Sequence, residues 1–452
     1  MPCDWRQSYV TRSHSRLDRR LSRSSVCTAA GPSNSAAEFL FRVFGLSATA
    51  DIYIQRDFPM KRTNPLSKAA LPLILSAALA IPLAARAQTF PAAHNFEVHE
   101  LTLNGVGCRV SDIDAGMAVG WCGNEPPRRA FAWTESTGMI DLGTLGGTTA
   151  LAFGTRNRRA VGSSTLSGDL TEKAMGWSLS TGMLDLGSFG GDSWMLAYAT
   201  AGNVVVGAGA VNGWPRAFRW KPSTGLVALP ALPGSTQSVA LDVDGNLIAG
   251  YSDTSSLHGY RPLVWRTNGT LIDPIGAPLE LCGFSVCGDG ISTAVRDGLV
   301  VGYSRNAAEE SRAFAWSEAG GLQDLGVVAG STESFALDTD DGRVVGQLSG
   351  PLTTRAFIWT AATGMRAITP ATVNAVATSI NGARVVGWYA SGDTNGQRPF
   401  LWTRLRGPVD VTPPGFNGSR PVGIDAAGRI AVVYEDENPA NTKSVVLVPR
   451  SL

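Results

Sequence analysis

A tryptophan recurs at nearly constant intervals, and this repeat constrains the fold more than any other feature of the chain. Seven tryptophans follow a basic, a small and an apolar residue, as in RAFAW at 312–316, and their spacings run from 43 to 51 residues. The seven are Trp133, Trp177, Trp220, Trp265, Trp316, Trp359 and Trp402. A repeat of this length is typical of a solenoid, a propeller or another array.

A glycine, mostly in a Val-Val-Gly context, precedes each of these tryptophans by 13 to 15 residues. The seven glycines are Gly120, Gly162, Gly207, Gly250, Gly302, Gly346 and Gly387. Each unit contains four short apolar runs, which in residues 334–367 are SFALD, RVVGQL, RAFIW and GMRAI. Asp-Gly and Thr-Gly pairs separate these runs, which predicts consecutive β-hairpins. No segment has the 3.6-residue apolar period of a helical repeat.

The two ends of the chain hold complementary parts of one more unit. After the seventh unit, PVGIDAAG, RIAVVY and KSVVLVP match the first three runs, and FEVHELTL at 96–103 can supply the fourth. A ring uses such fragments to close, whereas an open stack has no need of them. We therefore predict an all-β fold, a β-propeller of eight four-stranded blades closed by an N-terminal strand, with seven blades as the alternative. The seven tryptophans are expected to fill the wedges between blades.

The N-terminal region resembles an export signal. Residues 60–87 have a basic start, an apolar run at 69–84 and an Ala-x-Ala ending, which predicts a signal peptide cleaved before Gln88. The apolar run is shorter than a bilayer span needs, so a membrane anchor is the weaker alternative. Residues 1–59 are interpreted as a mis-called upstream start or a disordered leader. Residues 88–452 are expected to form one propeller domain, secreted or periplasmic.

Composition narrows the partners of the exported chain. Residues 88–452 carry 26 Lys and Arg against 32 Asp and Glu, a net charge of about −6. This acidic balance argues against nucleic acid and anionic membranes as partners. The expected partners are a carbohydrate or an envelope protein, and a monomer is expected.

Four cysteines remain after cleavage, and export allows them to pair. Cys108 and Cys122 lie at equal distances from a turn at Ala115, which predicts that they face each other across a hairpin and form a disulfide. Cys282 and Cys287 bracket four residues and are predicted to close a tight loop. Free thiols and a metal site are the alternatives, although the spacing matches no zinc pattern. We predict no metal and no cofactor.

The repeat resembles the HAF-type repeat of bacterial extracellular proteins. The resemblance rests on RAFAWTESTGMIDLGTLGG from Arg129, on 183–191 and on 324–326, and it covers residues 96–448. The family's histidine is replaced by a basic residue in all eight units, namely Arg129, Lys173, Arg216, Arg261, Arg312, Arg355, Arg398 and Lys443. The resemblance implies export and a β-repeat fold, and it implies no activity. These basic residues form either an anion-binding ring or, as we expect, pairs with nearby carboxylates and aromatic rings.

The longest and most varied loops join the second and third runs and successive units, so we expect them on one face of the ring, where function is expected. Exposed aromatic rings there would stack on sugars or peptides, with inter-blade packing as the alternative role for those that follow the glycines. The ligand-binding candidates are Trp194, Trp214, Trp121, Tyr251, Tyr303, Trp388 and, in the 282–287 loop, Phe284.

No catalytic residue can be assigned from motifs. Acids expected on the same face, Asp192, Asp253, Asp289 and Glu309, leave room for a two-carboxylate polysaccharide hydrolase or lyase. Asp242-Val-Asp244 and Asp338-Thr-Asp340 suggest calcium but lack the glutamate of an EF-hand loop. The sequence thus favours an exported, non-enzymatic propeller whose loop face binds carbohydrate or protein. A propeller glycosidase or lyase and a structural envelope or matrix protein are the alternatives.

Overall fold

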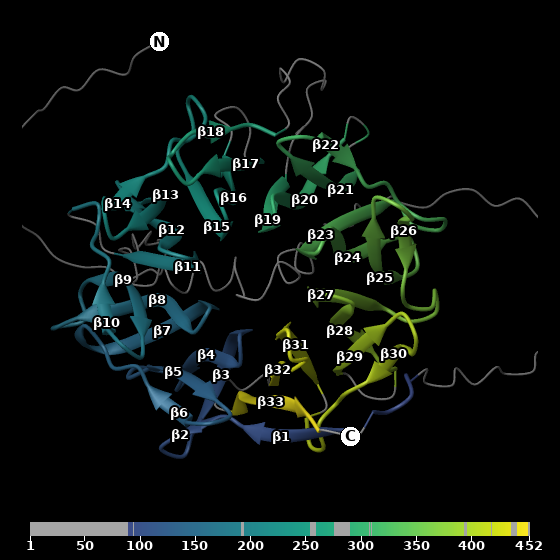
Figure 1. Cartoon of the computed structure of the whole chain (residues 1–452), viewed down its shortest axis with the longest axis horizontal. Helices are drawn as coiled ribbons and strands as arrows, with labels where there is room; N and C mark the ends of the chain where they lie inside the picture. The colour runs from purple at the N-terminus through teal and green to yellow at the C-terminus, as the bar shows by residue number, and fades with distance from the viewer. Residues whose placement is uncertain are drawn as a thin grey trace, which may run out of the picture.

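Eight sheets stand around a central axis in the computed structural model of the chain (Figure 1). The structure describes residues 89–93, 95–190, 194–253, 259–274, 290–306, 308, 310–392, 396–416, 418–434 and 441–450. All named elements in this part are β-strands, and it contains no helix long and apolar enough to cross a membrane. The prediction of an eight-bladed β-propeller is confirmed, and the seven-bladed alternative is wrong.

Blades 1 to 4 each contain four consecutive strands, with the innermost strand first. Blade 1 has β3 (Val106–Asp114), β4 (Met117–Cys122), β5 (Arg129–Thr134) and β6 (Gly138–Asp141), and the short β2 (Thr102–Leu103) pairs with β3. Blade 2 has β7 (Gly146–Arg156), β8 (Arg159–Leu166), β9 (Glu172–Ser178) and β10 (Gly182–Asp185). Blade 3 has β11 (Met195–Ala201), β12 (Val204–Val211), β13 (Trp214–Lys221) and β14 (Gly225–Ala228). Blade 4 has β15 (Ser238–Asp244), β16 (Leu247–Asp253), β17 (Tyr260–Arg266) and β18 (Leu271–Ile272).

Blades 5 to 7 repeat this order, and blade 8 departs from it. Blade 5 has β19 (Gly290–Arg296), β20 (Leu299–Arg305), β21 (Ser311–Ser317) and β22 (Gly321–Asp324). Blade 6 has β23 (Glu333–Asp340), β24 (Arg343–Ser349), β25 (Thr354–Thr360) and β26 (Gly364–Ala367). Blade 7 has β27 (Ala375–Asn381), β28 (Arg384–Ala390), β29 (Gln397–Thr403) and β30 (Gly407–Asp410). Blade 8 has β31 (Ser419–Ile424), β32 (Ile430–Tyr434), β33 (Lys443–Pro449) and, from the other end of the chain, β1 (Phe96–Glu100).

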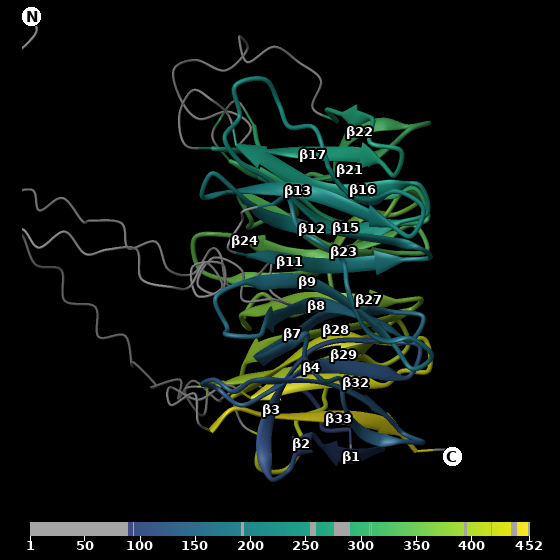
Figure 2. The same cartoon turned by 90° about the vertical axis from the view of Figure 1, so that its left-hand side faces the viewer.

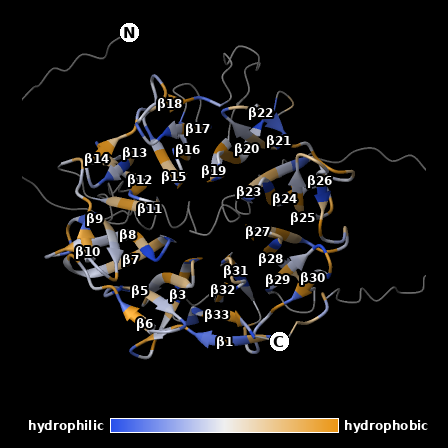
Figure 3. Ribbon diagram, viewed as in Figure 1, coloured by the Kyte–Doolittle hydropathy of each residue, from blue (hydrophilic) through white to orange (hydrophobic). Residues whose placement is uncertain are grey.

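The N-terminal strand closes the ring as predicted. β1 pairs antiparallel with β33 over five residue pairs, from Phe96 opposite Pro449 to Glu100 opposite Val445. β1 is largely hydrophilic, in contrast to the hydrophobic residues of the inner strands (Figure 3). Backbone hydrogen bonds therefore contribute much of what holds this closing strand in place.

The strands run roughly along the axis of the ring, so their ends lie on two opposite faces (Figure 2). We call the face with the second-to-third connections and the blade-to-blade connections the loop face. The opposite face has the tight turns between first and second and between third and fourth strands, and we call it the turn face. Each first strand runs from the loop face to the turn face.

The repeated tryptophans pack between neighbouring blades, as expected. Trp133 packs with apolar residues of blade 8, and Trp177 with those of blade 1. Trp265 is fully buried, and its indole Nε1 donates a hydrogen bond to the carbonyl oxygen of Pro230 at 2.7 Å. Trp220 and Trp402 are only partly buried. Burial of these rings accounts for the tryptophan period.

Cys108 and Cys122 face each other in the hairpin of β3 and β4 and form a disulfide, as the turn at Ala115 predicted. Cys282 and Cys287 lie outside the described residues, and so does the proposed bridge between them.

Candidate functional site

Every first strand has a β-bulge at the same position, and the bulged residue lines the central channel. In blade 1 the register of β3 and β4 shifts between Val110 and Asp112, which leaves Ser111 unpaired. The bulged residues are Ser111, Phe153, Tyr198, Leu241, Thr293, Leu337, Thr378 and Val422. All eight line one cavity. The bulge thus turns one side chain of each blade toward the axis.

The bulges also explain the repeated glycine of the second strands. A Cβ on any of the seven glycines would lie 1.9–2.1 Å from a carbonyl oxygen of the first strand, for example 1.9 Å from the oxygen of Phe335 at Gly346. No side chain fits at such a distance. The glycine is therefore required by the close approach of the bulged strand.

Aromatic side chains fill the half of the channel that lies toward the loop face. Trp121, Phe153, Trp194 and Tyr198 belong to one buried cluster with Tyr251, Tyr303 and Phe335. Trp121 and Phe153 meet edge to face at 6.2 Å, and Tyr303 and Phe335 do so at 5.0 Å. This half of the channel is packed like a protein core.

The predicted ligand-binding aromatics therefore divide between this core and the surface. The expectation of exposed rings is corrected for Trp121, Trp194, Tyr251 and Tyr303, because each ring belongs to the buried cluster and is less than a tenth exposed. Trp388 is likewise buried, against Leu337 and Val376. Trp214 alone among the described candidates is exposed, at 54%. Phe284 lies outside the described residues.

The half of the channel toward the turn face is a charged cavity of about 270 Å³. Its wall contains Asp112, Asp114, Asp242 and Asp338, and also Arg156 and Arg296. Arg156 Nη2 lies 2.5 Å from Asp244 Oδ1, and Arg296 Nε lies 3.9 Å from Asp340 Oδ1. Carboxylates thus outnumber guanidinium groups among the wall residues. No repeated motif marks this site in the sequence, because the charged residues occur in some blades and not in others.

Three of these carboxylates also tie their blade to the next one. Asp112 Oδ2 accepts a hydrogen bond from the backbone N–H of Thr155 at 2.8 Å, and Asp242 Oδ2 accepts one from Val295 at 2.8 Å. Asp338 Oδ2 does the same with Ile380 at 2.9 Å.

Each of the three belongs to an Asp-x-Asp pair whose second member binds the following turn. Asp114, Asp244 and Asp340 accept from the backbone N–H groups of Asn157, Asp297 and Gly382, respectively. All three pairs therefore act as inter-blade clamps, including the two at Asp242 and Asp338 that resembled calcium ligands in the sequence.

Burial raises the pKa values of three inner carboxyl groups. Asp112 keeps some exposed area toward the cavity, yet the surrounding protein removes water and raises its pKa to about 7, against the opposing amides of Thr155 and Ile113. Burial likewise raises the pKa of Asp338 to about 6, although the Ile380 amide and the Arg296 charge oppose it. The pKa of Asp242 is also raised by burial. Carboxyl groups with shifted pKa values in a cavity are typical of functional sites.

The acids expected on the loop face do not form a comparable site among the described residues. Asp253 accepts hydrogen bonds from the backbone N–H groups of Thr236 and Gln237, both at 2.9 Å, and so holds a loop. Asp192, Asp289 and Glu309 lie outside the described residues.

The repeated basic residues mostly pair with carboxylates or carbonyl oxygens, which favours the expected structural role over an anion-binding ring. Arg129 lies 2.9 Å from Asp141, Arg261 lies 2.8 Å from Asp273, and Arg355 Nη2 donates to the carbonyl oxygen of Ala329 at 2.8 Å.

No protein-family model matches the chain, and no curated protein does. Solved structures with a similar fold include a post-proline cleaving enzyme from Rickettsia typhi, at 11% identity and a TM-score of 0.47, covering 74% of this chain and 57% of that one. The propeller domain of the Trilobed protease from Pyrococcus furiosus has 9% identity and a TM-score of 0.42, covering 68% and 99%. A puromycin-hydrolyzing peptidase from Mycobacterium tuberculosis has 11% identity and a TM-score of 0.42, covering 64% and 52%.

This comparison corrects the sequence-based function. The similar propellers named here belong to peptidases, in contrast to the prediction of a non-enzymatic propeller that binds carbohydrate or protein. At 9–11% identity the likeness itself concerns the fold. The match covers little more than half of the length of the enzymes from Rickettsia typhi and Mycobacterium tuberculosis. Their activities are therefore not assigned to this chain.

Proposed function

We propose that this chain is a peptidase-type propeller that receives a cationic group of a peptide in the acidic cavity of its central channel. The observation that carries the proposal is the cavity itself, which all eight first strands line and to which five of them bring carboxylates or guanidinium groups. The peptidases with a similar fold suggest only that the ligand is a peptide.

The chemistry of the cavity selects the ligand. Four wall carboxylates face two guanidinium groups, and Arg156 is already engaged by Asp244. An ammonium or guanidinium group entering this wall gains charge-assisted hydrogen bonds, whereas an anion meets excess negative charge. A volume of about 270 Å³ suits one side chain or a chain end rather than a folded domain.

The aromatic core sets how far the ligand enters. Phe153, Tyr198 and Leu241 line the inner end of the cavity and belong to or pack against the buried cluster. A peptide entering from the turn face would therefore stop at this apolar floor. In this proposal the channel selects and admits the peptide, and the peptide bond is cleaved outside the channel.

The described residues offer little for the cleavage step itself. Their one histidine, His99, lies on the outer strand β1, with Nε2 3.3 Å from Glu97 and its ring against Trp133. His99 is therefore remote from the channel. The proposal includes a separate catalytic unit that contacts the ring and cleaves the peptide.

The proposal also includes the expectations from the sequence that concern export, repeat family, oligomeric state and partners. They are export by residues 60–87 to the periplasm or the exterior, a HAF-type repeat, a monomeric chain and peptides of the envelope as partners, without nucleic acid. An acidic propeller outside the cytoplasm would meet basic peptides without competition from nucleic acid.

Fluorescence anisotropy of labelled peptides tests the proposal. A hexapeptide with two arginines should bind the purified chain at least about tenfold more tightly than the same peptide with two glutamates. Asn381→Arg places a cation in the cavity wall and should weaken binding of the basic peptide by about tenfold or more.

The matched control is Gln323→Arg, which adds the same charge at an exposed position of the outer strand β22. It should leave the affinity unchanged. Equal affinity for both peptides, or an equal effect of the two variants, would show that the cavity is not the binding site.

A further inference from the structure

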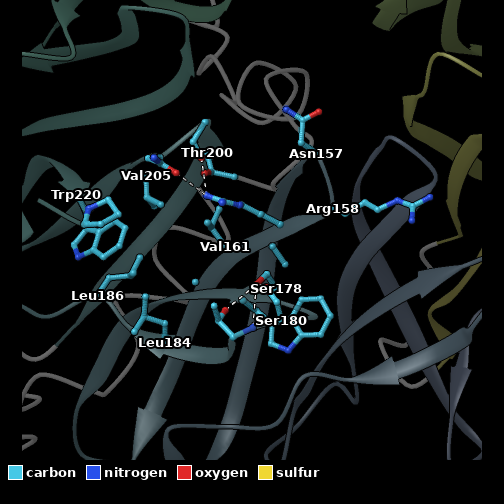
Figure 4. A pocket seen from close by; sticks show the side chains of 18 of the residues that line it. Asn157, Arg158, Val161, Ser178, Ser180, Leu184, Leu186, Thr200, Val205 and Trp220 are labelled. Atoms are coloured by element: carbon cyan, nitrogen blue, oxygen red, sulfur yellow. Dashed lines mark hydrogen bonds between the residues drawn. The ribbon is translucent and has the colours of Figure 1, made fainter.

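A second cavity opens on the turn face between blades 2 and 3, away from the central channel. It has a volume of about 610 Å³. Trp220, Leu184 and Leu186 lie on one side and Ser178 and Ser180 on another (Figure 4). We call it the blade 2–3 crevice. Its volume lies within the range of small-molecule sites.

The crevice exists because one side chain is missing. The residue before the repeated tryptophan faces the next blade, and in blade 2 it is Gly176. The other blades have Ala132, Arg219, Val264, Ala315, Ile358, Leu401 and, before Leu447 in blade 8, Val446 at this position. The indole of Trp220, next to Gly176, is only partly buried, as is Trp402 opposite Ile358, whereas Trp265 at the next interface, opposite Arg219, is fully buried.

The crevice combines this apolar wall with a basic rim. Arg158 and Arg159 line it, and no Asp or Glu is among the described residues that do so. Arg159 Nη1 donates to the carbonyl oxygen of Gly202 at 2.8 Å and to Asn203 Oδ1 at 3.1 Å, so the guanidinium is held in place at the rim. Arg158 stands at the far edge of the cavity, where its side chain extends away from Trp220 and its Nε donates to the carbonyl oxygen of Ala115 in blade 1 at 3.3 Å, so Arg159 is the cation nearer the apolar wall (Figure 4).

From this arrangement we propose that the blade 2–3 crevice binds a small amphipathic anion, a carboxylate attached to an aromatic or aliphatic group. The apolar group packs on Trp220 and Leu186, and the carboxylate faces the arginine rim. The charge of the rim is opposite to that of the channel cavity, so the two sites take ligands of opposite charge. This site is independent of the peptide site proposed for the channel.

Isothermal titration calorimetry with 4-phenylbutyrate and with its cationic counterpart 4-phenylbutylamine tests the assignment on the purified chain. We expect one saturable site for the acid and at least about fivefold weaker binding of the amine. Gly176→Val fills the position that other blades fill and should weaken binding of the acid by about tenfold or more.

Two further variants make the result specific. A Cβ at Gly176 would lie 3.4 Å from Leu186 Cδ2, an ordinary contact, so Gly176→Ala serves if the valine variant does not fold. Ile358→Val changes the same position of blade 6 and should leave the affinity unchanged. The proposal is overturned by the absence of saturable binding, by equal affinity for acid and amine, or by an unchanged affinity in both Gly176 variants.

Discussion

The two halves of the central channel belong to the same eight blades and yet differ in nearly every respect. Toward the loop face, rings such as Trp121 and Tyr303 are packed in a core. Toward the turn face, Asp112, Asp242 and Asp338 line an open cavity. The change occurs at the bulge. The bulge and the glycine give the blades the same backbone conformation. The side chains can therefore differ, and they stabilise the fold in the loop-face half and line the proposed binding site in the turn-face half.

Removal of an aromatic ring from the packed half should have the largest effect. Trp121→Ala should lower the free energy of unfolding by about 3–5 kcal/mol, because it removes a ring that is 4% exposed and packs against Phe153. Chemical denaturation measures this change. The affinity for the basic peptide should stay within about twofold of the parent chain, and a large loss of affinity in the still folded variant would contradict the division between the two halves.

The disulfide of blade 1 should rank next. Cys108 and Cys122 are 14 residues apart, and closing a loop of this size stabilises a protein by about 3 kcal/mol. The double variant Cys108→Ser, Cys122→Ser should therefore show a lower denaturation midpoint than the oxidised chain. Since the pair lies at the loop-face end of the hairpin, peptide affinity should not change. An unchanged midpoint would mean that the backbone ladder alone holds this hairpin.

A clamp in the charged half should cost less stability but should affect binding. Asp338→Ala removes the acceptor for the backbone N–H of Ile380, and an unsatisfied buried amide costs about 1–3 kcal/mol. It should also weaken binding of the basic peptide, in contrast to Trp121→Ala. Gln323→Ala on the exposed outer strand β22 is the control and should change neither stability nor affinity by a measurable amount. A pure stability effect in Asp338→Ala would exclude this carboxylate from recognition.

The pH dependence should have opposite signs for stability and binding. The folded protein raises the pKa of Asp112 to about 7 and that of Asp338 to about 6, so it holds more protons than the unfolded chain between about pH 4 and 7. The stability from these groups is therefore present at low pH and is lost as the pH rises through this window. Cation binding needs the ionised carboxylates and should weaken by about tenfold between pH 8 and pH 5.

Thermal denaturation and peptide titrations at pH 5, 6.5 and 8 separate the two trends. The charged neighbours must be considered together, because Asp114 and Asp242 act on Asp112, and Arg296 acts on Asp338. Asp338→Asn should flatten both curves. Parallel changes of stability and affinity with pH would show that binding simply follows folding.

The sequence predicted the ring because the ring depends on what repeats. The tryptophan spacing predicted the number and length of the blades. The fragments at 96–103 and after 420 predicted that β1 closes the ring. Cys108 and Cys122 could be paired because the turn between them was recognisable. Each of these inferences needs only local pattern and hairpin geometry.

The sites escaped prediction because they depend on what does not repeat. The bulged residue is Ser in blade 1, Phe in blade 2 and Leu in blade 4, so no residue type marks it. The aromatics after the glycine appeared exposed because the sequence does not show which neighbouring blade they face. Gly176 differs from its counterparts by one missing side chain, which is visible only after the blades are aligned and packed.

The pairing of β1 with β33 has a consequence for the order in which the molecule is made. Phe96 is among the first propeller residues to leave the ribosome, and its partner Pro449 is among the last. The strand must therefore wait, unpaired, while seven and a half blades are synthesised. Contacts so distant in sequence form slowly. The first strand to be made is the last to join the ring, so β1 stays unpaired until β33, the edge strand that it covers, has been made.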